Sequence, residues 1–290
     1  MIPALHVNST APFSMRNRDK KYYMEDFDLL STILSALLWR KYNGNIKLYT
    51  DSVGYDYYSS LGLLDLWDAG IDVKTLDNIP NNINQDIFWA AAKIFALQNE
   101  ETPIAIMDTD LMIWNNITNE LEGKEFVVLH REELNNGAYP PLETLKIRSG
   151  YNFDPQWDWS EQPCNMAFAY LSNPEFLKYY TACAIDFMTD NMEYPMELIT
   201  QMVFAEQRIV SVCAKQMNIK IHHFLDDPFQ QNNEIFSHLW GAKDIARNFP
   251  GQRKLICSAI VNKINLFFPK YYEKISEMEI VKAYETFTSE

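Results

Sequence analysis

The sequence predicts an α/β fold, Rossmann-like, with a mostly parallel central sheet flanked by helices. Short apolar runs alternate with helical periodicity through residues 1–115, and most of these runs end in polar turn residues. Such alternation is typical of parallel strands joined by helices that pack on both faces of one sheet. A chain of 290 residues is long enough for one large α/β domain or two small ones.

Apolar spacing defines the expected elements of the first part of the chain. Strands are expected where short apolar runs are bounded by polar residues, and helices where apolar side chains recur every three or four positions. The run at 104–107 should be a buried, central, parallel strand. The resulting strands are 3–7, 46–50, 71–76 and 104–107, and the helices are 25–42, 55–67 and 84–99.

The second part is less regular. Residues 135–162 contain prolines and large aromatic residues without periodicity, so we expect a functional loop there. No internal repeat or convincing domain boundary is visible, and a single domain over 1–290 is expected. The other expected elements are strands at 125–129, 166–171 and 219–225, a strand or loop at 236–243, and helices at 174–190, at 196–217 and from 255 onward.

The charge is negative and unevenly distributed. The formal net charge is −14, and residues 61–239 carry 10 Lys and Arg against 27 Asp and Glu. This balance argues against a nucleic-acid-binding surface in the middle of the chain. An anionic substrate bound there would need a metal ion or local basic residues.

The cysteines and the N-terminal residues lead us to expect a cytoplasmic location. Cys164, Cys183, Cys213 and Cys257 show no C-x-x-C spacing, so reduced and mostly buried thiols are expected. The N-terminal residues lack the basic and apolar regions of a signal peptide, and no apolar stretch is long enough for a transmembrane helix.

Two carboxylates at the end of the expected central strand predict a metal site. Asp108 and Asp110 follow the apolar run 104–107, at the sheet edge where open α/β sheets bind ligands. In an extended segment residues i and i+2 point the same way, so the two side chains could share one cation. Mg²⁺ and Mn²⁺ prefer such oxygen ligands and often bind them together with substrate phosphates. The alternative is a strand that ends in a solvated Asp-Thr-Asp turn.

The order of these elements resembles the nucleotide-sugar-binding half of glycosyltransferases with the GT-A fold. Asn8, at the end of the first strand, stands where such enzymes begin their nucleotide contacts. Cys164-Asn165-Met166-Ala167-Phe168 is similar to the asparagine-bearing strand beside the sugar site, and Ala205-Glu206-Gln207 resembles an acidic-Gln element of many of these enzymes. The resemblance therefore implies that Asn165 and Glu206 face the donor sugar as catalytic candidates.

Two further features resemble family 8, the family of glycogenin. Lys93 precedes the Asp-x-Asp strand, where family 8 members place a lysine. His238-Leu239-Trp240-Gly241-Ala242-Lys243 is similar to their late H-x-x-G…K element, in which the histidine completes the metal shell and the lysine meets the diphosphate. Here Lys243 lies one residue closer to the glycine and no Pro-Trp follows it, which puts the lysine's role in question. Gly241 would let the backbone approach the diphosphate.

The resemblance implies a metal-dependent glycosyltransferase of hexosyltransferase type that uses Mn²⁺ or Mg²⁺. Its donor would be a nucleotide-diphosphate sugar, with a UDP-sugar favoured, and its acceptor a carbohydrate or glycolipid. Residues 1–134 would form the nucleotide-binding half and 135–252 the acceptor and donor-sugar half, with 253–290 as a C-terminal helical segment. The resemblance assigns Asp108, Asp110 and His238 to the metal, and Asn8, Lys93, Asp108, Gly241 and Lys243 to the nucleotide.

Each of these residues also has a plainer interpretation. A helical lysine such as Lys93 usually extends its ammonium into solvent, and a helical glutamate such as Glu206 is usually solvated. His238 could be a core histidine, and Asn8 could simply form a turn. Trp157 and Trp159 could cover a sugar or anchor their loop to the core.

Two other functions remain open. Asp108 and Asp110 could be the nucleophile and acid of a haloacid-dehalogenase-type phosphatase, with Ile221–Asp227 as its second metal strand. That family, however, expects Thr or Val where Met112 stands. The chain could also be a non-catalytic nucleotide-sugar or carbohydrate-binding protein.

The segment Arg253–Lys274 carries five basic residues among Ile, Leu, Phe and Tyr. Such a segment could make peripheral contact with an anionic membrane. It could equally be a helix packed on the domain and broken at Pro269.

Overall fold

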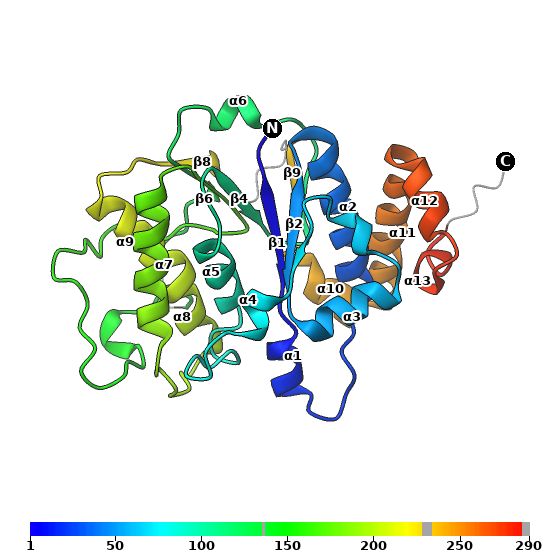
Figure 1. Cartoon of the computed structure of the whole chain (residues 1–290). Helices are drawn as coiled ribbons and strands as arrows, with labels where there is room; N and C mark the ends of the chain where they lie inside the picture. The colour runs from blue at the N-terminus through cyan, green and yellow to red at the C-terminus, as the bar shows by residue number, and fades with distance from the viewer. Residues whose placement is uncertain (135–136, 228–233, 286–290) are drawn as a thin grey trace.

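A computed structural model describes residues 1–134, 137–227 and 234–285 of the chain. The described part has three layers, in which one twisted sheet lies between two groups of helices (Figure 1). This arrangement confirms the predicted α/β fold with a mostly parallel sheet.

The central sheet has the order β3-β2-β1-β4-β7-β6-β8 among the described residues. Strand β7 runs antiparallel to both of its neighbours, and the remaining pairs are parallel. The apolar run before the Asp-Thr-Asp tripeptide is central, as predicted, and pairs in parallel with β1 but antiparallel with β7. The strands are β1 (Ala4–Asn8), β2 (Ile46–Thr50), β3 (Ile71–Asp72), β4 (Ile104–Met107), β6 (Phe126–His130), β7 (Phe168–Leu171) and β8 (Ile221–Leu225).

A second, two-stranded sheet joins residues far apart in the sequence. Strands β5 (Leu111–Ile113) and β9 (Phe236–His238) pair antiparallel, with Leu111 opposite His238. This pairing brings a late segment of the chain to the end of β4.

Helices cover both faces of the central sheet (Figure 1). Helices α2 and α11 pack together on one side, while α5 and α9 both pack on α7 on the other. The helices are α1 (Ala11–Arg16), α2 (Asp26–Tyr42), α3 (Ser52–Ser60), α4 (Lys74–Asp77), α5 (Ala91–Gln98), α6 (Thr118–Leu121), α7 (Pro174–Met188), α8 (Leu198–Val203), a π-helical turn η3 (Phe204–Arg208), α9 (Ile209–Gln216), α10 (Ala242–Asn248), α11 (Pro250–Phe267), α12 (Pro269–Ile275) and α13 (Glu279–Lys282).

The two faces of the sheet build two apolar clusters. Along β4, Ala105 and Met107 belong to the cluster on the α2 side, whereas Ile104 and Ile106 belong to the cluster on the α5 side. Successive side chains of a strand point to opposite faces, so a strand buried on both faces is apolar throughout. This explains why the run before Asp108 shows no polar alternation.

Local side-chain hydrogen bonds account for three predicted boundaries that were wrong. The strand expected over 71–76 stops at Asp72, whose carboxylate accepts a hydrogen bond from the Thr75 backbone and starts α4. The helix expected over 84–99 begins only at Ala91, because the Asn84 side chain accepts from the backbone of Asp86 and holds a turn.

The helix expected over 55–67 is shifted toward the N-terminus. Asp51 caps it by accepting from the Gly54 backbone at 2.9 Å, so α3 begins at Ser52. It ends at Ser60, two residues before Gly62, whose φ of +69° is a conformation that glycine adopts easily.

The C-terminal helices pack on the domain. Helix α11 lies against α2. The helical segment is interrupted before Pro269, where the separate helix α12 begins. Arg253 forms ion pairs with Glu25 and Asp26. Among the described helices, none combines the length and the apolar character needed to cross a bilayer.

Candidate active site

The Asp-Thr-Asp tripeptide forms a turn rather than the extended segment that we predicted. The carbonyl of Asp108 accepts from the Leu111 backbone at 3.0 Å, which closes a four-residue turn between β4 and β5. The backbone N–H of Asp108 donates to the Ala167 carbonyl at 2.7 Å. The two carboxylates therefore come together through the turn and not through strand alternation.

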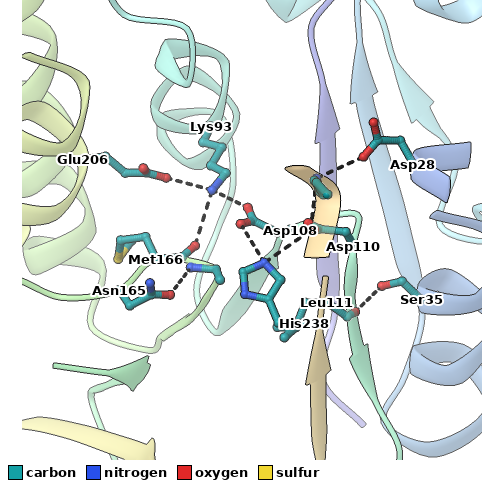
Figure 2. A network of polar contacts seen from close by, with 12 residues as sticks. Asp28, Ser35, Lys93, Asp108, Asp110, Leu111, Asn165, Met166, Glu206 and His238 are labelled. Carbon is teal, nitrogen blue, oxygen red and sulfur yellow. Dashed lines mark hydrogen bonds and ion pairs between the residues drawn. The ribbon is translucent and has the colours of Figure 1, made fainter. Parts of the chain in front are cut away.

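A chain of hydrogen bonds holds this turn from the α2 side of the sheet. Ser35 Oγ donates to the Leu111 carbonyl at 2.5 Å, and His6 Nε2 lies 3.1 Å from Ser35 Oγ. Trp67 Nε1 lies 3.3 Å from His6 Nδ1. An indole N–H only donates, so Nδ1 must accept and the neutral His6 ring carries its proton on Nε2. Figure 2 shows the last link, from Ser35 to Leu111.

His238 meets both carboxylates of the turn. Because Leu111 pairs with His238 across β5 and β9, the imidazole lies directly beside the turn (Figure 2). Its Nε2 lies 3.8 Å from Asp108 Oδ2 and 3.5 Å from Asp110 Oδ2. One ligand atom from each of the three residues can be chosen so that all lie within 4.8 Å of one another.

These separations fit a divalent cation. Adjacent ligands of an octahedral Mg²⁺ ion lie about 2.1 Å from the metal and therefore about 3 Å from each other. Small side-chain rotations would bring Asp108, Asp110 and His238 to such spacing. An imidazole nitrogen and two carboxylate oxygens also suit Mn²⁺.

Glu206 is buried and Lys93 is half-buried beside this cluster, contrary to the default for helical charged residues. Lys93 Nζ lies 2.5 Å from Asp108 Oδ1 and 2.8 Å from Glu206 Oε1 (Figure 2). Glu206 is 3% exposed and lies in the π-helical turn η3. The idea of a solvated Glu206 is therefore wrong, and Lys93 points to the ligand edge of the sheet instead of to solvent.

Burial and charge act against each other in this pair. Burial alone would lower the pKa of Lys93, but the charges of Asp108 and Glu206 outweigh it and hold the pKa above its usual value. Burial raises the pKa of Glu206, and the ammonium of Lys93 opposes that shift. Lys93 is therefore a fixed cation shared by two carboxylates.

Lys243 has an equivalent place beside Asp110. Its Nζ lies 3.0 Å from Asp110 Oδ2 and 3.1 Å from Asp28 Oδ1. Burial alone would raise the pKa of Asp110, but contacts with His238 and Lys243 lower it below the usual range. Asp28, at the start of α2, did not stand out in the sequence because acidic residues are common in the first turn of a helix.

Asn165 is fixed by a residue that the sequence did not single out. Its side-chain nitrogen donates to Glu132 Oε1 at 2.9 Å, and its oxygen accepts from the Ala167 backbone at 3.0 Å. Glu132 lies two residues after the end of β6, at the same sheet edge as the Asp-Thr-Asp turn. Asn165 therefore reaches the site in a defined orientation (Figure 2).

The site opens into two adjoining cavities. One, of about 280 Å³, is lined by the Asp-Thr-Asp turn with Lys93, Asn165, Glu206, His238 and Lys243. The other, of about 540 Å³, is lined by residues 8–9 and 22–25, with Phe13, Arg16 and Arg247. Trp89 and Thr109 line both cavities, so the two adjoin each other.

Asn8 and Gly241 lie at the margins of the site. The Asn8 amide nitrogen donates to the Tyr58 hydroxyl at 2.6 Å, and its oxygen accepts from Tyr22 at 3.1 Å, so the side chain is oriented within the larger cavity. Gly241 has a φ of −67°, and among the described residues nothing lies within 4 Å of a Cβ added there. Neither backbone strain nor packing requires glycine, and its role at a diphosphate stays a prediction.

The site carries an excess of negative charge. Asp108, Asp110, Glu206 and Asp28 supply four carboxylates, and Lys93 and Lys243 supply two ammonium groups. When these acids are ionised, they outnumber the two ammonium groups by two. A divalent cation would cancel that charge, which is the condition for an anionic diphosphate to bind here.

The structure argues against the phosphatase alternative. Its second metal strand would be Ile221–Asp227, but β8 is three strands from β4 in the sheet order. Adjacent strands lie about 4.8 Å apart, so about 14 Å separates β8 from β4. His223 pairs with Asp226 at 3.0 Å instead of approaching Asp108.

Comparisons with known proteins give a family but no assigned activity. A family model described as "Family of unknown function (DUF6734)" matches residues 13–278. No match to the sequence was found among curated proteins.

Several solved structures are similar to this chain at low identity. Mouse xyloside xylosyltransferase 1 is 13% identical, over 77% of this chain and 84% of that one, with a TM-score of 0.36. The glycosyltransferase GlyE of Streptococcus pneumoniae TIGR4 is 11% identical, over 94% and 65%, with a TM-score of 0.36. The galactosyltransferase LgtC is 8% identical, over 71% of each chain, also with a TM-score of 0.36.

Proposed function

We propose that this chain, which belongs to the DUF6734 family, is a metal-dependent glycosyltransferase with a GT-A-like fold. It would move a sugar, in the manner of a hexosyltransferase, from a nucleotide-diphosphate donor to a carbohydrate or glycolipid acceptor. The observation that carries the proposal is the convergence of Asp108, Asp110 and His238 on one point beside Lys243.

The residues have distinct roles in this proposal. Asp108, Asp110 and His238 would hold Mn²⁺ or Mg²⁺, and the ion would supply Lewis-acid stabilisation of the departing diphosphate. Lys243 releases Asp110 and Asp28 and turns to the diphosphate oxygens. Asn8 and the 540 Å³ cavity bind the nucleoside, with a uridine nucleotide favoured.

The donor sugar occupies the 280 Å³ cavity beside Asn165 and Glu206. Glu132 orients Asn165 toward it, and Lys93 forms an ion pair with the buried Glu206 side chain. A carboxylate held this way can accept a hydrogen bond from a sugar hydroxyl or stabilise positive charge that develops on the ring.

Calorimetry of nucleotide binding tests the proposal. UDP and GDP are titrated into the protein with Mn²⁺ and again with a chelator, and the nucleotide should bind only with the metal. Asp110→Asn should abolish this binding, while Asp56→Asn, at an exposed position on α3, should leave it unchanged. Equal affinity in the presence of chelator would remove the metal from the mechanism.

Turnover separates the transferase from the alternatives. Incubation with a panel of nucleotide sugars and Mn²⁺ should release free nucleotide. A protein that binds nucleotide sugars without releasing nucleotide would be a binding protein. Release of phosphate from simple phosphoesters would instead indicate a phosphatase.

Cytoplasmic location and peripheral membrane contact through residues 253–274 stay predictions. Within this segment Arg253 pairs with Glu25 and Asp26, Lys274 pairs with Asp65, and Lys263 lies over the Trp114 ring. These internal contacts favour the packed-helix interpretation. Co-sedimentation with anionic vesicles at low salt decides between the two, because membrane contact requires binding under that condition.

A further inference from the structure

One tyrosine of the loop at residues 137–162 contacts the wall of the donor-sugar cavity. The side chain of Tyr139 is 9% exposed, and its hydroxyl donates a hydrogen bond to Gln207 Oε1. Gln207 lies in the π-helical turn η3 and lines the 280 Å³ cavity, whereas Tyr139 is not among the described residues that line it. Tyr139 therefore acts on the site from behind, through the side chain of Gln207.

The hydrogen-bond partners of Gln207 determine which way its amide points. A hydrogen bond joins the Gln207 side chain to Glu206, and an ionised carboxylate only accepts hydrogen bonds. The amide nitrogen must therefore face Glu206, which leaves the amide oxygen to accept from Tyr139. Burial raises the pKa of Tyr139, so its hydroxyl stays protonated and remains a donor. The opposite orientation of the amide would set its oxygen against the carboxylate.

Glu206 thus receives donors from two different elements. Lys93 Nζ, from α5, lies 2.8 Å from Glu206 Oε1, and the Gln207 amide of η3 is the second donor. A continuous chain of polar contacts joins the loop to the Asp-Thr-Asp turn, and its members in order are Tyr139, Gln207, Glu206, Lys93 and Asp108.

The hydroxyl of Tyr139 orders a side chain that would otherwise be free to rotate. Glu206 and Gln207 are consecutive residues of η3 and both line the cavity, and single π-helical turns are frequent at functional sites. A free glutamine side chain samples many rotamers and loses that freedom when a ligand orders it. A side chain that is ordered beforehand loses less entropy on binding, so the contact with Tyr139 prepares this wall for a ligand.

We propose that Tyr139 is a positioning residue for the donor sugar and acts through the Gln207 amide on Glu206. The proposal rests on the proposed glycosyl transfer, in which Glu206 faces that sugar. Because Tyr139 lies behind the cavity wall, its hydroxyl should affect reaction of the sugar and spare binding of the nucleotide. The functional loop that the sequence predicts at 135–162 thereby gains a specific role.

The test compares reaction of the sugar with binding of the nucleotide alone. Release of nucleotide is measured with Mn²⁺ and UDP-glucose, UDP-galactose, UDP-N-acetylglucosamine, UDP-xylose and GDP-mannose, and the best donor is used for the variants. In Tyr139→Phe, kcat/KM for nucleotide release should fall about tenfold, the order expected for one lost hydrogen bond. Calorimetry should show the affinity for UDP or GDP, whichever the best donor contains, within about twofold of wild type, whereas general damage to the site would lower both quantities.

Tyr179→Phe is the matched control. The Tyr179 hydroxyl accepts from Trp157 Nε1 at 3.1 Å, so this variant also removes one phenolic hydrogen bond to the loop. Neither nucleotide affinity nor nucleotide release should change in it. Gln207→Leu tests the route of the effect, because it should lower kcat/KM at least as much as Tyr139→Phe. Adding Tyr139→Phe to Gln207→Leu should then cause no further loss.

Three results would overturn the role of Tyr139 and leave the transferase intact. They are wild-type kcat/KM in Tyr139→Phe, an equal loss of nucleotide affinity and kcat/KM in that variant, and losses from Tyr139→Phe and Gln207→Leu that multiply in the double variant. If the wild-type protein binds neither UDP nor GDP with Mn²⁺, or releases no nucleotide from any donor, the proposed function itself fails and the role of Tyr139 falls with it.

Discussion

Two lysines neutralise the Asp-Thr-Asp turn from opposite sides, and they do so in different surroundings. Lys93, from α5, joins Asp108 to Glu206, and Lys243, from α10, joins Asp110 to Asp28. The side chain of Glu206 is 3% exposed, whereas that of Asp28 is 20% exposed. Both lysines border the 280 Å³ cavity, and the difference lies in their outer partners: Glu206 is buried, whereas Asp28 also borders the 540 Å³ cavity.

Because of this difference, we expect one lysine to matter mainly for stability and the other mainly for ligand binding. A buried carboxylate that loses its cation cannot be solvated, so the Lys93 side should contribute mainly to the folded state. Asp28 and Lys243 can exchange their contact for water or a phosphate at modest cost. The Lys243 side should therefore be the part of the site that rearranges when a ligand binds.

Replacement of Lys93 should have the largest effect on stability. Lys93→Met leaves Glu206 buried without its cation, and removing one partner of a buried pair costs about 3–5 kcal/mol. Urea unfolding measures the change. Lys243→Met is the matched variant on the other side, and its cost should be clearly smaller.

A double variant sharpens this test. Glu206→Gln removes the charge that Lys93→Met leaves unpaired, so the double variant should regain part of the lost stability. If Lys93→Met and Lys243→Met destabilise the protein equally, the two sides do not differ as described.

Replacement of His238 should have the next largest effect, on metal affinity. His238→Ala removes one of three candidate metal ligands. Replacing a residue that only contacts a metal ligand typically weakens metal binding about 10–100-fold, so we expect Mn²⁺ affinity to fall by that much or more. Without metal, its unfolding free energy should change little. His223→Ala, at a more exposed histidine on β8, is the control and should leave Mn²⁺ affinity unchanged. Unfolding of His238→Ala with intact metal affinity would identify His238 as a core residue.

Much of the fold could be predicted from the sequence, because alternating buried strands and amphipathic helices produce a clear spacing of apolar residues along the chain. The strand at 46–50 and the helix at 25–42 match the observed elements to within a residue. Boundaries set by one polar side chain, such as Asn84 before α5, could not be predicted, because an Asx turn competes with a helix of similar sequence.

Most residues of the site could be predicted from the sequence, but the contacts between them could not. The order of motifs pointed to His238, yet its contact with the turn depends on the pairing of β5 with β9, which are more than 120 positions apart. The partners Asp28 and Glu132 have no motif and become visible only when the sheet edge is assembled. Propensity also suggested a solvated Glu206, and tertiary packing overrode it.

Lys243 should affect nucleotide affinity and spare the metal. Because the ammonium is proposed to move from Asp110 to the diphosphate, Lys243→Ala should weaken UDP binding about tenfold, the equivalent of 1.4 kcal/mol. Mn²⁺ affinity without nucleotide should stay within a few fold of wild type. Calorimetry with each ligand measures both. Lys263→Ala, at a lysine that lies over the Trp114 ring, is the control. Loss of Mn²⁺ binding in Lys243→Ala would contradict the division between the two sides.

The smallest effect concerns His6. This residue helps to hold the Asp-Thr-Asp turn, which carries the carboxylate partners of both Lys93 and Lys243. Burial lowers the pKa of His6 to about 3, against the opposing charges of Asp108 and Asp110. Protonation would place a second N–H at Nδ1, facing the N–H of Trp67, so the folded protein resists it. The unfolded chain takes up this proton near pH 6.5 and the folded chain does not, so stability is present above that pH and falls as the pH drops from 6.5 toward 3.

When the pH falls from 7 to 5.5, His6 should lower the free energy of unfolding by about 1 kcal/mol. In His6→Gln, the amide oxygen can accept from Trp67 and the amide nitrogen can donate to Ser35, but the side chain does not titrate. Urea unfolding at both pH values should therefore show a smaller pH dependence in the variant by that amount, since every other titrating group is common to the two proteins. An identical pH dependence would mean that His6 already titrates in the folded state, and that the turn is not held by a neutral imidazole.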